Sequence, residues 1–338
     1  RGILRFRMPI ALLPVKISKT GKCWLQYSFF RILVKGKIPL ADLLIAGAVF
    51  LGYDVDQEHD FATLSDYYPL SGRDPFLRSI AIPKEAATVI LMRPTGDADR
   101  GPFEVLMVHR HPDSIFVPEC YVFPGGCIDA GDCAPELVPY CCGRDAETAW
   151  HILGDMPDAA MSLGAWIAAV RETFEETGIL LARPPFSIDR LTKLRRLLLN
   201  GEKTFTELVR EEKWKLALER LKYFAHWITP EFLPYRYDVR FFVALAPEGQ
   251  TACPDGIELT GHVWITPGQA LDDYAADRFP MVLPTIMTLR ELSAFPNIEA
   301  VLAGAAVKKV PAILTRVVPR ESGLVEIMPD GTVFSPVR

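Results

Sequence analysis

The sequence has few cysteines, and nothing in their spacing suggests a disulfide framework. Seven cysteines occur in 338 residues, and no Cys-x-x-Cys spacing is present. A disulfide scaffold is therefore not expected, and a reducing compartment fits better. Five cysteines cluster near two histidines: Cys120, Cys127, Cys133, Cys141 and Cys142. Structural zinc sites favour short paired spacings, so we interpret these residues as buried or free thiols.

Long apolar runs and several catalytic motifs are also missing. A membrane-spanning helix needs roughly 18 apolar residues, and the nearest candidate, 38–53, is shorter and contains Asp42. No membrane span is therefore expected. The sequence contains no Gly-x-x-x-x-Gly-Lys-Ser/Thr loop, no Gly-x-Ser-x-Gly elbow and no His-Glu-x-x-His motif. These absences argue against P-loop, α/β-hydrolase and zinc-protease chemistry.

Acidic residues are absent from the first 41 positions, which hold nine Lys or Arg. The whole chain has a net charge of −5, so the remainder is near −14. This modest net charge argues against nucleic acid as a partner. We interpret 1–80 as a basic N-terminal extension and linker, with dense turn signals over 54–80. The basic segment is a poorly ordered tail, a targeting segment, a membrane-surface patch or translated non-coding sequence. Without a targeting role, we expect a cytoplasmic location.

The rest of the chain mixes strand and helix patterns without regular alternation. The residues predict strands over 86–92, 103–108, 121–123, 224–229, 237–245 and 258–265. They predict helices over 162–177, 188–200, 205–221, 267–276, 283–294 and 297–305, and a hairpin turn at Asp330-Gly331. Residues 127–158 have little periodicity and are interpreted as irregular. The pattern favours an α+β fold over a doubly wound parallel sheet.

The helix expected at 162–177 is the most informative segment. At about 100° per residue, one stripe is apolar and faces a core: Trp166, Ile167, Val170 and Phe174. Glu172, Glu175 and Glu176 fall on the opposite face. Such a charge run is ordinarily a solvated surface. However, like charges at i and i+4 destabilise a helix, and acids in its last turn oppose the macrodipole.

A divalent cation would make this costly arrangement intelligible. Mg²⁺ and Mn²⁺ prefer oxygen ligands, and Glu172 and Glu176 lie one turn apart. Arg171 precedes Glu175 by four residues, so it can pair with that carboxylate. Upstream, Gly125 and Gly126 end a strand, and paired glycines allow backbone to approach a ligand closely, although such a pair is more often only a turn.

The segment Arg171–Ile179 resembles the second half of the Nudix box, with Thr173 in place of a bulky aliphatic residue. The first half is similar to Gly126–Asp132, with Asp in place of Glu. About 31 additional residues separate the two halves. A subgroup that includes the peroxisomal acyl-CoA diphosphatase is similar in carrying an insertion inside the box. The segments 116–132, 169–181, Trp227–Pro230 and Arg240–Phe242 also resemble that subgroup, and the similarity covers roughly 84–275.

The resemblance implies a Nudix fold, a mixed β-sheet sandwiched between helices, over 81–338, with insertions at about 133–163 and 187–222. It implies that Glu172 and Glu176 bind Mg²⁺ or Mn²⁺ with the carbonyl of Gly125. Glu175, held by Arg171, would support the site. Family members often take a general base from a later loop. Glu258 is the candidate here, against the alternatives of Asp255 as base or of Glu258 as an exposed edge residue.

The implied activity is hydrolysis of a diphosphate bond in a small nucleoside-diphosphate-linked substrate. The first candidate substrate is CoA or acyl-CoA, and the second is ADP-ribose or NADH. The remaining alternative is a non-catalytic module that senses a nucleotide. The coenzyme A signature places Arg and Gly where this chain has Ile115 and Glu119. Arg110 and Gly126 are candidate substrate-binding residues, although Arg110 is equally compatible with a surface role. The helices within 187–222 either cap the site or lie on the surface. The oligomeric state is left open.

Overall fold

The computed structural model describes residues 80–97, 101–114, 116–184, 186–231, 233–320 and 323–334. The basic segment 1–41, most of the linker and Ile115 lie outside the described residues. Contacts group 78–319 and 324–337 into one compact unit. The α+β class predicted from the sequence is confirmed, because a mixed sheet is packed against several helices. No helix in the described part of the chain is long and apolar enough to cross a membrane.

The main sheet is built around β1 (Lys84–Pro94), an almost continuous buried run of Ala, Val, Ile, Leu and Met. The strand order is β10-β7-β8-β1-β2-β3, with β4 added to β1 and β9 added to β2. The other members are β2 (Phe103–Arg110), β3 (Tyr121–Val122), β4 (Gly125–Cys127), β7 (Lys222–Ile228), β8 (Tyr237–Leu245), β9 (Leu259–Ile265) and β10 (Ala312–Leu314). Along its length β1 is parallel to β8.

The sheet forks along the other edge of β1. Near its start, Ala87 and Thr88 pair antiparallel with Gly126 and Gly125 of β4. Near its end, Met92 pairs with Val105 of β2, which gives the hairpin expected from the sequence. Gly125 and Gly126 therefore lie in the fork, beside the central strand.

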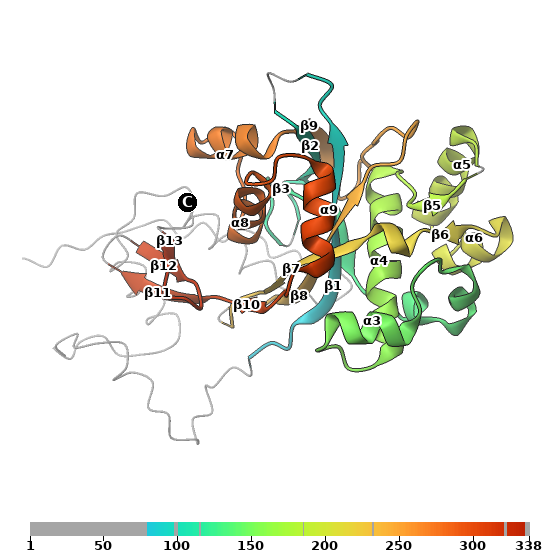
Figure 1. Cartoon of the computed structure of the whole chain (residues 1–338), viewed down its shortest axis with the longest axis horizontal. Helices are drawn as coiled ribbons and strands as arrows, with labels where there is room; N and C mark the ends of the chain where they lie inside the picture. The colour runs from blue at the N-terminus through green and yellow to red at the C-terminus, as the bar shows by residue number, and fades with distance from the viewer. Residues whose placement is uncertain are drawn as a thin grey trace, which may run out of the picture. The chain divides into compact units, whose positions relative to one another are not determined.

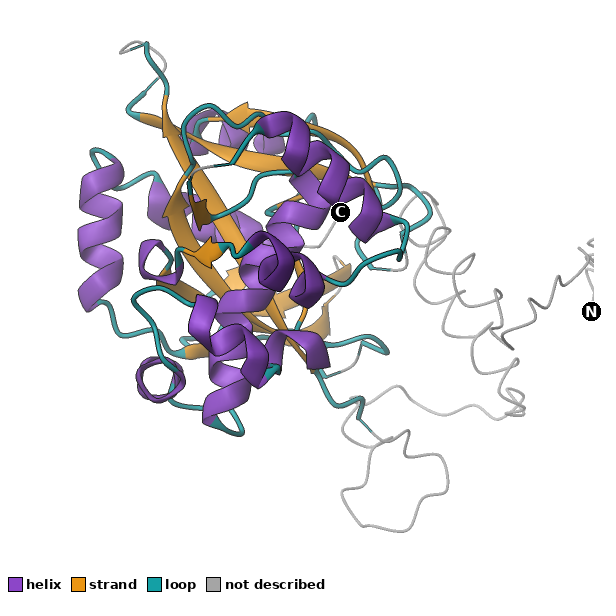
Figure 2. Cartoon of the chain, turned by 90° about the vertical axis from the view of Figure 1, so that its right-hand side faces the viewer, coloured by secondary structure: helices purple, strands orange, loops and turns teal. Residues whose placement is uncertain are grey.

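Helices cover both faces of this sheet (Figure 1). One face packs against α4 (Ala159–Thr177), with α3 (Ala146–Leu153), α5 (Ile188–Leu199) and α6 (Phe205–Glu212) around it. The other face packs against α7 (Pro267–Ala275), α8 (Leu283–Leu292) and α9 (Ile298–Val307). Figure 2 shows the helices distributed on either side of the strands. Side-chain caps begin most of these helices, such as Asp158 for α4 and Thr204 for α6.

Two sequence predictions were wrong in these helical regions. Residues 127–158 are not irregular: they form 3₁₀ turns at Ala130–Cys133 and Pro135–Tyr140, then α3. The Asp145 side chain accepts a hydrogen bond from the Thr148 N–H and begins that helix. The helix expected over 205–221 ends at Glu212, because Lys213 takes a left-handed conformation with φ of 52°. A short strand β6 (Lys215–Leu216) and a 3₁₀ turn (Leu218–Arg220) follow.

Two small sheets complete the described structure. Strand β5 (Ala182–Arg183) pairs with β6. Near the C-terminus, β11 (Arg316–Arg320), β12 (Gly323–Ile327) and β13 (Val333–Phe334) form a three-stranded sheet. The hairpin predicted at Asp330-Gly331 joins β12 to β13, and Gly331 has φ of 87°.

Candidate active site

Helix α4 carries the candidate site. The apolar stripe expected from the sequence is fully buried: Trp166, Ile167, Val170 and Phe174 are each at most 1% exposed. Gly178, with φ of 76°, ends the helix as predicted. The opposite face is covered too, since Arg171 is 7% exposed and Glu176 is 5% exposed. The acidic face is therefore packed against β4 and the 3₁₀ turn at Ala130–Cys133, and it is not a solvated surface.

Arg171 is the centre of this packed polar face. Its Nε and Nη2 donate to both carboxylate oxygens of Asp132, at 2.9 and 2.8 Å. Nη2 also donates to the Cys127 carbonyl at 2.8 Å. Nη1 donates to Glu172 at 2.9 Å and to Glu175 at 3.1 Å. The Glu175 pairing expected from the i,i+4 spacing is present, and it is one of several.

Asp132 is the partner that the sequence reading missed. Its side chain is buried, and it takes the bidentate interaction that fixes the plane of a guanidinium. Its own carboxylate also accepts the Asp129 N–H at 2.8 Å. The available signal was its place in the first half of the box, where it was noted only as a shorter acid.

The two glycines of β4 allow the helix and sheet to meet. A Cβ on Gly126 would lie 2.4 Å from Oε1 of Glu172, and one on Gly125 would lie 2.4 Å from the Ala87 carbonyl oxygen. At Gly125 the obstacle is backbone, so no side chain fits there, whereas a side chain at Gly126 would displace the Glu172 carboxylate. The Gly125 N–H donates to Oε2 of Glu176 at 2.9 Å. The glycine pair is therefore a close-approach element, and it holds Glu176 directly.

Burial desolvates the carboxyl groups of Glu172 and Glu176. It raises the pKa of Glu172 to about 7, although Arg171 acts in the opposite direction. The pKa of Glu176 is raised well above its ordinary value, first by burial and then by the charge of Glu172. Burial is the first cause of both shifts, and neighbouring carboxylates add to it: Glu175 for Glu172, and Glu172 for Glu176. A cation placed between them would favour the charged forms.

The carboxylate and backbone oxygens therefore suit a hard divalent cation, although the carboxylates of Glu172 and Glu176 form hydrogen bonds to different groups. Within the described ranges, no group of three His, Cys, Asp or Glu side chains is arranged to hold a metal. Glu172 and Glu175 point to Arg171, while Glu176 points to Gly125. The candidate ligands are therefore the pair Glu172 and Glu176 with backbone oxygen from β4.

Two charged residues predicted from the sequence lie close to Glu176. Arg110 ends β2, and its guanidinium lowers the pKa of Glu176, whereas Glu258 raises it. The Nε of Arg110 is buried and has no hydrogen-bond partner among the described residues. Glu258 is exposed, just before β9, and its carbonyl accepts the His111 N–H at 2.8 Å. Asp255 is less available as a base, since its Oδ1 accepts three backbone N–H groups at 2.9–3.1 Å.

Helix α5 contributes to the site through Arg195. This side chain is 8% exposed, and its Nε and Nη2 donate to the Glu175 carbonyl at 2.9 and 2.7 Å. A cation at the C-terminal end of α4 also suits the helix dipole. Helix α5 therefore stabilises the last turn of α4, and it is more than a surface helix.

A second buried arginine, Arg240 of β8, was not anticipated as part of a cluster. It is 1% exposed and pairs with Glu85 of β1 and, at 3.1 Å, with Asp155. It also lies 2.9 Å from Asp238. His226 of β7 contacts Asp238 as well, and its Nδ1 lies 3.4 Å from Asp155. This cluster joins the loop after α3 to the sheet.

The cysteine cluster contains free thiols in the described structure. Cys120, Cys127, Cys133, Cys141 and Cys142 are partly buried. Burial raises the pKa of Cys120 and of Cys141 to about 11, so both thiols are protonated near neutral pH.

Comparisons with known proteins agree with this geometry. Residues 147–292 match the family model described as the NUDT19 Nudix domain. The chain is similar to acyl-coenzyme A diphosphatase NUDT19 of Xenopus laevis, with 26% identity over 233 residues, 58% of this chain and 61% of the frog protein. The human protein of that name is 25% identical over 272 residues, 69% of this chain and 72% of its own. The chain thus spans less than two thirds of the frog relative.

A solved structure shows the same fold. The crystal structure of a NUDIX hydrolase from Alicyclobacillus acidocaldarius superposes with a TM-score of 0.57 and 26% sequence identity. The match covers 68% of this chain and all of that one.

Proposed function

The chain belongs to the Nudix hydrolase superfamily, as the sequence resemblance predicted, and from this premise we propose that it hydrolyses a diphosphate bond in a CoA or acyl-CoA type substrate. One observation carries the proposal. Glu172 and Glu176 meet the Gly125–Gly126 backbone in a closely packed space, and Arg171 fixes the carboxylates around them. A protein that only binds nucleotides has no need for this full set of acids.

The donor set supports Mg²⁺ or Mn²⁺ held by Glu172, Glu176 and the Gly125 carbonyl. When bound, such an ion neutralises phosphate oxygens and lowers the pKa of water. The protein then supplies position and charge. Arg171 keeps Glu172 and Glu175 in place through hydrogen bonds of 2.9 and 3.1 Å. Glu258, exposed and near Glu176, is the proposed base that accepts the proton of the attacking water.

Arg110 is the proposed substrate-binding cation. A buried N–H without a partner is costly, and a phosphate oxygen would satisfy the Nε of Arg110 with a charge-assisted hydrogen bond. The names of the relatives favour a CoA-type substrate. The backbone at Glu119 also supports it, because φ there is 58°, in the left-handed region that favours glycine. The chain thus keeps the conformation that suits the signature glycine, although the side chain differs.

Product release from a substrate panel tests the reaction. We expect 3′,5′-ADP from CoA with Mg²⁺ or Mn²⁺, and less AMP from ADP-ribose or NADH. Glu176→Gln should lower kcat by at least about 100-fold, because it removes charge where the phosphate is stabilised. Glu211→Gln, on the exposed face of α6, is the matched control. No turnover on the panel, or full activity of Glu176→Gln, would contradict the proposal.

Substitution of Arg110 tests the substrate assignment separately. Arg110→Met should raise KM for CoA by about tenfold or more, since it removes a charged contact to phosphate. Arg210→Met, at an exposed position of α6, should leave KM unchanged. Steady-state kinetics with CoA measure both. An unchanged KM for Arg110→Met would return Arg110 to the surface role that its sequence position also allowed.

A further inference from the structure

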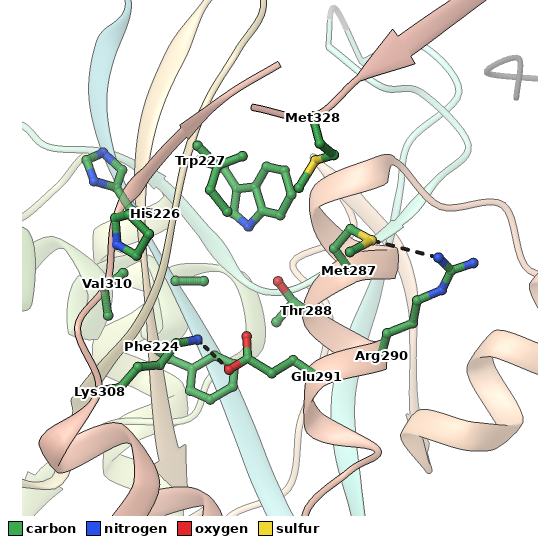
Figure 3. A pocket seen from close by; sticks show the side chains of 13 residues that line it. Phe224, His226, Trp227, Met287, Thr288, Arg290, Glu291, Lys308, Val310 and Met328 are labelled. Atoms are coloured by element: carbon green, nitrogen blue, oxygen red, sulfur yellow. Dashed lines mark hydrogen bonds and ion pairs between the residues drawn. The ribbon is translucent and has the colours of Figure 1, made fainter. Parts of the chain in front are cut away.

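A cavity of about 340 Å³ lies on the face of the main sheet that α4 does not occupy. Its floor includes Phe224 and Trp227 of β7, which belong to the core cluster shared with α8 and α9. Helix α8 provides one wall, and β10 with the segment before it provides another (Figure 3). The volume is at the lower end of the range for small-molecule sites.

Two buried polar groups face this cavity without partners. Trp227 is 5% exposed and Thr288 is 2% exposed. Neither Nε1 of Trp227 nor Oγ1 of Thr288 has a hydrogen-bond partner in the described part of the chain. Figure 3 shows the indole nitrogen and the hydroxyl both directed into the space between β7 and α8. Buried polar groups are normally satisfied, so these two atoms mark a place for a ligand oxygen.

The charged groups around the cavity have a positive excess. Nζ of Lys308 lies 2.5 Å from Glu291 and 4.2 Å from the centre of the Phe224 ring. Arg290 contacts the sulfur of Met287 at 3.9 Å. Arg290 has no carboxylate partner among the described residues, so two cations stand against one acid.

We propose that this cavity binds a small amphipathic carboxylate. The indole N–H can only donate a hydrogen bond and the Thr288 hydroxyl can donate one, whereas a carboxylate only accepts. Lys308, which pairs with Glu291, supplies a cation in the lining of the same cavity. The apolar body of the ligand would lie against Phe224, Met287 and Met328, and methionine adapts to varied shapes.

This site is separate from the proposed catalytic centre. Trp227 pairs with Val239, Val239 with Ala86, and Ala86 with Cys127, next to Gly126. At a strand spacing near 4.8 Å, this row places Trp227 about 14 Å from Cys127 along the sheet. Trp227 also faces the opposite side from α4. The proposal therefore goes beyond diphosphate hydrolysis and does not depend on it.

Calorimetric titration of the full chain with octanoate tests the proposal. We expect saturable binding to the wild type. Thr288→Val keeps the shape but removes the hydroxyl, so affinity should fall about fivefold to tenfold. The change also removes an unpartnered buried hydroxyl, so the unfolding temperature should not fall. Thr192→Val, on the exposed part of α5, should leave affinity unchanged.

Substitution of Lys308 tests the charge of the ligand. Lys308→Gln should weaken octanoate by about tenfold, while Lys309→Gln, at the exposed neighbouring position, should have no effect. Octanamide, which has the same tail but no charge, should bind more weakly than octanoate and should respond less to Lys308→Gln. Absence of saturable octanoate binding would overturn the proposal. Equal binding of both probes, or binding insensitive to Thr288→Val, would overturn it as well.

Discussion

Two buried arginines, Arg171 and Arg240, each bind several carboxylates, and the two clusters differ in the net charge that remains. Arg171 faces Asp132, Glu172 and Glu175, with Glu176 one turn beyond. Arg240 faces carboxylates from three separate segments, and His226 lies between two of them. Arg171 links α4 to the 3₁₀ turn at Ala130–Cys133, and Arg240 links the loop after α3 to β1 and β8. Only the Arg171 cluster crowds extra carboxylates against a glycine backbone.

The two clusters differ in role: the Arg171 cluster positions catalytic carboxylates, whereas the Arg240 cluster, here called the clamp, links separate segments of the fold. Arg171 forms ion pairs with four acids, Asp129, Asp132, Glu172 and Glu175. The last two lie on the same helix as Arg171, so their spacing is fixed before any tertiary contact forms. The acids around Arg240 belong to β1, β8 and the loop after α3, so the cluster exists only when these segments meet. We therefore expect substitutions at Arg171 and its partners to affect catalysis, and substitutions at Arg240 to affect stability.

The largest effect on stability should come from Arg240→Met. This change leaves Glu85 and Asp238 close together without their cation, and breaking a buried ion pair costs about 3–5 kcal/mol. Urea unfolding measures the loss. The enzyme that stays folded should keep its kcat, because the ion-pair partners of Arg240 are Glu85, Asp155 and Asp238 and include none of the candidate metal ligands. Arg240→Lys should recover part of the stability, and lost activity at unchanged stability would reverse the comparison.

The next largest effect should come from Asp132→Asn, which should lower both the free energy of unfolding and kcat. The amide places an N–H₂ group against a guanidinium that also only donates, so unfolding free energy should fall by about 2 kcal/mol. Because Arg171 then loses its fixed plane, kcat should fall by about 10- to 100-fold. KM for CoA should change little. Asp132→Glu, which restores the charge, should recover activity; failure to do so would make Asp132 a purely structural residue.

The Arg171 cluster could be predicted from the sequence and the Arg240 cluster could not, and the reason is physical. Arg171 and its glutamates are neighbours along one helix, so their geometry follows from 3.6-residue periodicity. Arg240 and Asp155 are 85 residues apart, and no local pattern links them. Local chemistry also misled where it was ambiguous: the amphipathic run over 205–221 continues past Glu212, but Lys213 turns left-handed and the chain becomes β6.

The burial of the acidic face of α4 could not be predicted from the sequence either. A helical wheel places Glu172, Glu175 and Glu176 together, but it does not reveal what covers them. Coverage depends on β4, whose two glycines let its backbone approach α4, and on Asp132. The sequence leaves open whether the helices within 187–222 cap the site or lie on the surface, and Arg195 of α5 in fact binds the Glu175 carbonyl.

The smallest effect should come from Asp155→Asn, and it is the sharpest test of how the clamp works. The Asp155 side chain is 43% exposed, so its ion pair with Arg240 is screened by water. Glu85 and Asp238 still neutralise the arginine, and unfolding free energy should fall by about 1 kcal/mol or less. Thermal unfolding measures it, with Asp189→Asn on α5 as the surface control. A loss as large as that of Arg240→Met would show that the contact of the loop after α3 with Arg240, through Asp155, provides most of the stability of the clamp.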